Sequence, residues 1–128
     1  LIELLVVVAI LGIIAAIGIV SYNGYVSSAK KRSAENVMQQ ISLGQTEYYS
    51  DNGMYYRNSN GTSCNPTSTT SSAIETNLLG GTDSITSEMG YELCVANDAT
   101  NYTVFATENG GNCEITMTAL GAFVRTNC

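Results

Sequence analysis

The chain has no histidine and no tryptophan, a single proline, and only five basic residues among its 128. The absence of histidine removes the commonest general acid or base and a frequent zinc ligand. No serine or cysteine has a recognisable base partner, and the glycine pairs Gly80-Gly81 and Gly110-Gly111 lack the context of a phosphate-binding loop. The sequence therefore argues against an enzyme, a bound cofactor and a metal site.

The shortage of positive charge also bears on binding partners. Eleven acidic residues give a net charge of −6, and from Met54 onward only Arg57 and Arg125 are positive. Proteins that bind nucleic acids normally present a basic patch, so direct nucleic-acid binding is not expected. The carboxylates of the loops lack the spacing of an EF-hand, which favours solvated side chains over a calcium site.

With its one proline at position 66, the chain runs uninterrupted from Leu1 to Gly53. Leu4 to Val20 has no charge and no side-chain amide, and as a helix it would span roughly 25 Å. Apolar residues from Val26 to Tyr48 then recur at helical spacing, and Asn52-Gly53 supplies a stop. We expect one long helix, hydrophobic over residues 1–27 and amphipathic over residues 28–53.

A single carboxylate interrupts the apolar run. Glu3 is the only charged side chain in the first twenty-nine residues, and an unpaired carboxylate in hydrocarbon costs a few kcal/mol. Near a helix start it also interacts favourably with the helix dipole, by about 0.3–1 kcal/mol. Two interpretations follow: a helix-end charge at an interface, or a charge that pairs with a partner in an assembly.

The basic residues and the cysteines give opposite indications of the compartment in which the C-terminal part lies. Lys30, Lys31 and Arg32 follow the apolar run and by the positive-inside rule alone favour a cytoplasmic C-terminal part. The four cysteines form no CxxC pair, which favours two disulfides and an oxidising compartment over a metal site. Among three connectivities we expect Cys64–Cys94 and Cys113–Cys128, because each bond closes its loop without crossing the other.

The composition of the remaining sequence changes after residue 53 and again after residue 90. Residues 54–90 are rich in serine, threonine, asparagine and glycine, which indicates a surface loop with a short helical turn over Ala73 to Leu79. Four runs of strand-forming residues follow, at 91–96, 102–107, 113–119 and 122–126. The prediction is an α+β fold in which a four-stranded antiparallel sheet over 91–128 packs on the amphipathic half of the helix.

The opening LIELLVVVAILGIIAAIGI resembles the N-terminal segment of type IV pilins, which type II secretion pseudopilins share. SYNGYVSSAKKRSAENV, EYYSDNGMYY and the strand-rich tail closed by cysteines support the resemblance, which covers the helix strongly and the head loosely. In that family a leader is removed before a phenylalanine, which becomes N-methylated, and a threonine follows it. The chain is therefore expected to begin two residues inside the mature protein.

The resemblance implies a structural subunit of a bacterial type IV pilus, with residues 28–128 as its globular head. Residues 1–27 would anchor it in the inner membrane, and the pilus assembly machinery would then polymerise identical copies into an extracellular fimbrial filament. Such filaments serve adhesion, twitching motility or uptake. A minor pilin, a DNA-uptake pilin and a type II secretion pseudopilin are the alternatives, and the four cysteines with a long loop favour a pilus subunit.

The resemblance also assigns roles within the helix. It gives Glu3 a partner, the N-terminal amine of a neighbouring subunit, so that the pair would set axial register during assembly. Many pilins have a helix-kinking proline where this chain has Val20. Any loosening of the helix would therefore depend on Gly12 and Gly18.

Overall fold

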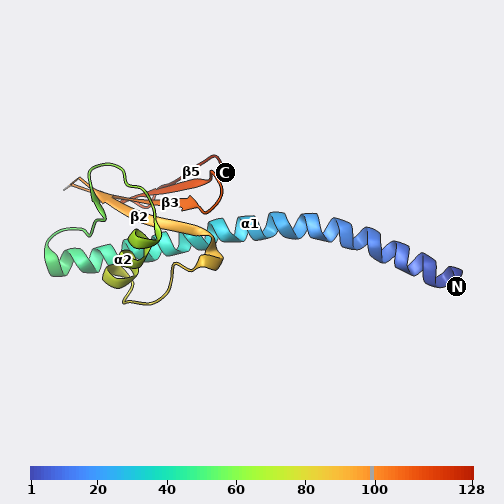
Figure 1. The fold of residues 1–128 in the computed structure, drawn as a ribbon. Coiled ribbons are helices and arrows are strands. Elements are labelled where there is room, and N and C mark those ends of the chain that lie inside the picture. The colour runs from blue at the N-terminus through green and yellow to red at the C-terminus, as the bar shows by residue number, and fades with distance from the viewer. Residues whose placement is uncertain (99) are drawn as a thin grey trace. The chain divides into compact units, whose positions relative to one another are not determined.

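The structure is a computed structural model that describes residues 1–98 and 100–128; Ala99, in the turn expected between two strands, lies outside the described residues. Contacts divide the chain into two units, Leu1–Arg32 and Ser33–Cys128, whereas the sequence analysis placed a boundary after residue 27. Helix α1 (Ile2–Asn52) belongs to both units (Figure 1). The predicted long helix is confirmed.

The second half of α1 packs in the core of the Ser33–Cys128 unit. Its buried residues follow helical spacing, namely Ala34, Val37, Met38, Ile41 and Gln45. The helix stops at Gly53, whose φ of +74° is the left-handed conformation that glycine adopts without strain. The Gly53 amide donates to the Tyr49 carbonyl oxygen at 2.8 Å, which completes the last turn.

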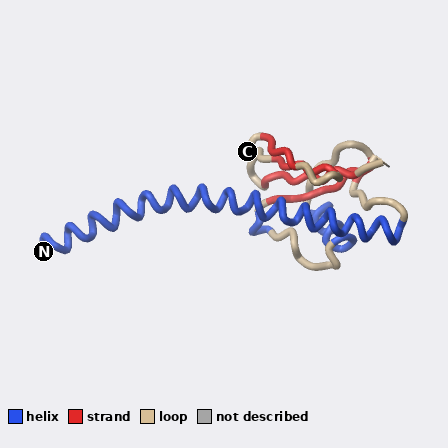
Figure 2. Tube along the Cα trace, turned by 180° about the vertical axis from the view of Figure 1, so that it is seen from behind, coloured by secondary structure: helices blue, strands red, loops and turns tan. Residues whose placement is uncertain are grey.

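Five strands form one sheet in sequence order, β1 (Ser59–Asn60), β2 (Tyr91–Asn97), β3 (Tyr102–Glu108), β4 (Glu114–Thr118) and β5 (Phe123–Thr126). The predicted antiparallel meander is confirmed as β2 to β5. The expected count of four strands was wrong, because β1 adds a parallel pairing with the end of β2. Figure 2 shows the sheet lying along the second half of α1.

Side chains protect the part of the β2 edge that β1 leaves uncovered. Asn58 takes the place of a neighbouring strand. Its backbone amide donates to the Val95 carbonyl, and its side-chain Oδ1 accepts from the Val95 backbone amide, both at 2.8 Å. Further along, Thr70 Oγ1 donates to the Leu93 carbonyl at 2.7 Å, and Ser71 Oγ accepts from the Leu93 amide at 3.0 Å. This edge is therefore closed to pairing with another chain.

Residues 54–90 are more ordered than the sequence analysis expected. Helix α2 (Ser68–Leu78) begins five residues before the short turn that was predicted from Ala73, and a 3₁₀ turn, η1, covers Ser87–Met89. A capping box explains the early start, because Thr67 and Thr70 satisfy each other's backbone amides. Propensity alone hides this start, since serine and threonine are weak helix formers.

The core lies between α1, α2 and the inner face of the sheet. Its fully buried side chains include Met38, Ile41, Ile74, Leu93, Val95, Val104, Ile115 and Met117. Gly44 lets α1 approach α2 closely, because a Cβ there would lie 2.5 Å from the carbonyl oxygen of Leu78. The predicted packing of the sheet on the amphipathic half of the helix is thus present, and α2 packs beside α1 on the same core.

Two disulfides link segments that are distant in sequence. Cys64, in the loop before α2, is bonded to Cys94 of β2, and Cys113 is bonded to Cys128 at the chain end. The first bond fastens residues 54–67 to the outer side of β2. The second fastens the end of the chain to the start of β4.

Candidate functional site

The Leu1–Arg32 unit exposes an apolar surface. Every large apolar side chain from Leu1 to Val20 is more than half exposed, and the best 18-residue window of α1 has a mean hydropathy of 3.0 with none of it buried. An apolar surface of this extent marks contact with lipid or with other proteins. The helix is long and apolar enough to cross a membrane.

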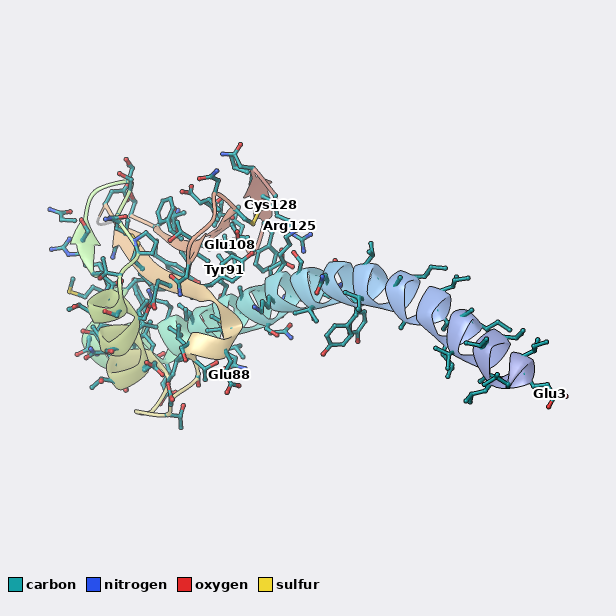
Figure 3. The ribbon with its side chains drawn as sticks, turned by 45° about the vertical axis from the view of Figure 1, so that its right-hand side comes forward. Glu3, Glu88, Tyr91, Glu108, Arg125 and Cys128 are labelled. Atoms are coloured by element: carbon teal, nitrogen blue, oxygen red, sulfur yellow. A yellow bond between two sulfur atoms is a disulfide. The ribbon has the colours of Figure 1, made fainter. Side chains whose placement is uncertain are left out.

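Glu3 lies in the first turn of α1, at the end of this apolar surface (Figure 3). Its side chain is exposed, and the ion pair between Arg125 and Glu35 lies in the other unit. Glu3 therefore has no cation within its own chain, over the residues that the structure covers. The first turn of the helix offers only its dipole to this carboxylate.

Gly12 and Gly18 lie within continuous helix. A Cβ added at either position would meet no atom within 4 Å, so contacts within the chain do not require glycine there. Each glycine costs the helix roughly 1 kcal/mol relative to alanine. Their role in loosening the helix stays a prediction.

The Ser33–Cys128 unit is strongly acidic, with ten Asp and Glu residues against two arginines. One of those arginines is engaged: Arg125 of β5 donates from Nε to Glu35 Oε2 at 3.0 Å and from Nη2 to Glu35 Oε1 at 2.8 Å. These charge-assisted bonds raise the pKa of Arg125 above its ordinary value. The pair joins β5 to α1, so Arg125 has a structural role.

A buried tyrosine lies near this pair. Tyr91 is 1% exposed, and its hydroxyl donates to Cys113 Sγ at 3.3 Å. Burial raises the pKa of Tyr91, and the nearby carboxylate of Glu108 acts in the same direction. Figure 3 shows Tyr91, Glu108, Arg125 and Cys128 near one another, close to the C-terminal end of the chain. We interpret this cluster as a fastening of the C-terminal strand.

Sequence reasoning missed a second cluster, at the end of α1. The ring of Tyr48 contacts that of Tyr56, and the ring of Tyr49 contacts that of Tyr55, with centroids 5.7 and 4.8 Å apart. The Tyr55 ring also meets the ring of Tyr102 of β3, edge to face, at 4.8 Å. The motif EYYSDNGMYY places tyrosines on both sides of the helix stop, which was the available signal.

Arg57, the other arginine of this unit, lies beside the tyrosines. Its Nη1 donates to Asn60 Oδ1 at 3.1 Å, and it lines a cavity together with Tyr49 and Tyr55. A cation next to exposed aromatic rings can bind a ring-shaped ligand that carries negative charge. The structure thus presents two candidate sites, the apolar helix with Glu3 and the tyrosine cavity.

Residues 20–118 match a family model described as type IV minor pilin ComP, DNA uptake sequence receptor. The chain belongs to this family. Among curated proteins and among solved structures, none matches the chain. The match confirms the resemblance to pilins. The family is one of minor pilins, which the sequence analysis held as an alternative. The match begins after residue 19, so it does not include Glu3, Gly12 or Gly18.

Proposed function

We propose that this minor pilin is incorporated into a type IV pilus through the Leu1–Arg32 segment of α1. The observation that carries the proposal is the apolar helix, whose large side chains from Leu1 to Val20 are all more than half exposed, in a chain whose other unit is compact. Such a helix is stable in lipid or among partner helices, and exposed in water it would drive aggregation. The same segment can serve as an inner-membrane anchor first and as part of the filament interior afterwards.

The partners follow from the family and the helix. The sequence analysis expected a filament of identical copies, whereas a minor pilin is better explained as one subunit among copies of a more abundant pilin. We therefore propose a mixed extracellular filament, built by the pilus assembly machinery, with the Ser33–Cys128 unit on its outside. Adhesion and twitching motility would be properties of that filament.

Glu3 is proposed as the residue that sets register during assembly. Its carboxylate would pair with the N-terminal amine of a neighbouring pilin, because a charge in an apolar bundle needs a counter-charge. A leucine there would still pack, but it would not distinguish the correct axial position from its neighbours. Burial of the partner amine without a counter-charge would add to the cost of assembly.

The experiment measures this chain in filaments sheared from cells and in the membrane fraction of the same cells. We expect the wild-type chain in both fractions, and Glu3→Leu in the membrane but strongly depleted in filaments. Glu47→Gln, which removes an exposed carboxylate from the other unit, is the matched control and should leave the filament fraction unchanged. Absence of the wild-type chain from filaments would contradict the proposed function, and full incorporation of Glu3→Leu would contradict the role of Glu3.

A second candidate function comes from the family description, which names a DNA uptake sequence receptor. We propose that this chain acts in DNA uptake as a pilus subunit, while its own contact with DNA is weak. Ten carboxylates in the Ser33–Cys128 unit repel a polyanion, and Arg125 is already paired with Glu35.

The test separates uptake from direct binding. We expect DNA uptake to fall in a strain that lacks the chain, while the purified chain binds duplex DNA only at non-specific strength, with Kd about 10⁻⁴–10⁻⁶ M at physiological salt. Tight and sequence-selective binding by the purified chain would contradict the weak-contact proposal. Unchanged uptake in the deletion strain would contradict the uptake role.

A further inference from the structure

The tyrosine cavity beyond the end of α1 has a volume of about 170 Å³. It is lined by Tyr49, Gly53, Met54, Tyr55, Arg57, Asn97 and Thr100. Sites for drug-sized ligands usually measure about 300–1,000 Å³, so this one suits a single ring.

The walls of the cavity are held in place by hydrogen bonds from buried side chains. Gln45, which is fully buried, donates from Nε2 to the Tyr56 carbonyl at 2.8 Å and accepts from the Tyr56 amide at 2.7 Å. Asn97 Nδ2 donates to the Tyr55 carbonyl at 3.1 Å. The backbone at Tyr55 and Tyr56 is thus held by one side chain from α1 and one from β2, which reduces the ordering cost of binding.

The aromatic wall is supported from behind. Tyr55 lies between the rings of Tyr49 and Tyr102, both with centroids 4.8 Å away. Tyr102 is anchored in turn, because its hydroxyl lies 2.8 Å from Ser42 Oγ. Tyr49 remains 49% exposed and Met54 47% exposed, so the cavity offers apolar surface that is open to water on one side.

This arrangement selects among ring-shaped ligands. A flat aromatic ligand is best held when both of its faces are buried, whereas a pyranose ring can pack its apolar face on tyrosine and keep its hydroxyl groups hydrated. The cation at the rim is Arg57, whose Nη1 donates to the neutral amide oxygen of Asn60. A carboxylate on the ring would therefore find a charged hydrogen-bond donor.

The charge of the whole unit limits the ligand further. Ten acidic side chains repel an extended polyanion such as DNA over its entire length. A single carboxylate next to Arg57 would gain a charge-assisted hydrogen bond there, opposed by the Asp98 carboxylate, whose Oδ1 accepts from Thr100 Oγ1 at 2.6 Å in the cavity wall. We propose that the cavity binds one acidic sugar ring, a uronate, with its apolar face on Tyr49 and Tyr55 and its carboxylate on Arg57.

The experiment uses saturation-transfer NMR on the full chain in detergent micelles, with methyl glucuronide, methyl glucoside and the dinucleotide of thymidine as probes. We expect the strongest transfer to the ring protons of the glucuronide. Tyr49→Ala should reduce that signal at least fivefold, whereas Tyr49→Phe keeps the ring and should retain it. Arg57→Gln should lower the glucuronide signal to the level of the glucoside.

Controls distinguish the cavity from other aromatic surface. Tyr25→Ala removes a tyrosine that is 72% exposed in the other unit, and it should leave the glucuronide signal unchanged. Near-ultraviolet circular dichroism of each variant shows whether the Ser33–Cys128 unit is folded. The proposal is overturned if folded Tyr49→Ala binds the glucuronide like wild type, if Arg57→Gln keeps the preference for it, or if the dinucleotide gives the stronger signal.

Discussion

Replacing Gln45 by leucine tests whether one buried amide orders the end of α1. Gln45 is fully buried, and its side chain closes two hydrogen bonds with the backbone of Tyr56. Leucine has nearly the same volume and leaves both the amide and the carbonyl of Tyr56 without that partner. The change therefore removes polar contacts while keeping the core filled.

The expected loss of stability follows from these two groups. A buried polar group left without a partner costs about 1–3 kcal/mol, and both Tyr56 groups are partly buried, so we take the lower half of that range for each. Leucine recovers about 1 kcal/mol through additional apolar burial. The free energy of unfolding of the Ser33–Cys128 unit should fall by roughly 1–3 kcal/mol, which for a unit of this size lowers Tm by about 5–20 °C.

The assay is thermal unfolding of the full chain in detergent micelles, followed by near-ultraviolet circular dichroism, which reports the packing of tyrosines. Gln40→Leu is the matched control, since Gln40 is exposed on the same helix and its replacement should change stability by no more than about 0.5 kcal/mol. Equal Tm values for Gln45→Leu and Gln40→Leu would refute the reasoning. If Gln45→Leu loses the near-ultraviolet tyrosine signal at temperatures below its unfolding transition, the wall of the tyrosine cavity itself depends on Gln45.

Three further outcomes are expected from the same unit. Gly44→Ala should destabilise it by about 1–3 kcal/mol, because the new methyl would lie 2.5 Å from the carbonyl oxygen of Leu78; a wild-type Tm would contradict that close packing. Burial raises the pKa of Tyr91 and Tyr102 above the ordinary value of 10.0, so the unfolded chain loses these protons first. The contribution of these two tyrosines to the free energy of unfolding should be fully present below pH 10 and decline above it. Equal free energies of unfolding by urea at pH 9 and pH 11 would exclude this linkage. Replacing both cysteines of the Cys113–Cys128 disulfide by alanine should lower the free energy of unfolding by about 3 kcal/mol, as expected for a closed loop of 15 residues. A Tm within 3 °C of wild type would show that Arg125 alone suffices to hold β5.

Much of the fold could be predicted from local patterns. The absence of proline before residue 66 and the helical spacing of apolar residues indicated α1, and the glycine after Asn52 marked its end. Alternating strand formers separated by turn residues located β2 to β5 within one or two residues. These signals are local because each element is defined by its own periodicity and its own caps.

Glu3 was also visible in the sequence, for a related reason. A lone carboxylate in an apolar run is exceptional whatever the fold, because its desolvation cost depends on the surroundings of the run and not on any particular contact. The structure of the single chain adds that the apolar helix is exposed and that Glu3 takes no part in the Arg125–Glu35 ion pair.

Tertiary structure alone decided the elements and the site that depend on distant partners. Ser59 and Asn60 are poor strand formers, and they become β1 because Ala96 and Asn97 of β2 supply the pairing. Ser71 is buried in α2 because the backbone of Leu93 satisfies its hydroxyl.

The tyrosine cavity is the clearest case of dependence on the fold. Tyr49 comes from α1, Arg57 from the following loop and Asn97 from β2, so the chain must fold before the three residues share one hollow. No periodicity or spacing in the sequence predicts that these three residues line one cavity. They are brought together by burial of the core and by the hydrogen bonds from Gln45 and Asn97 to the backbone of Tyr56 and Tyr55.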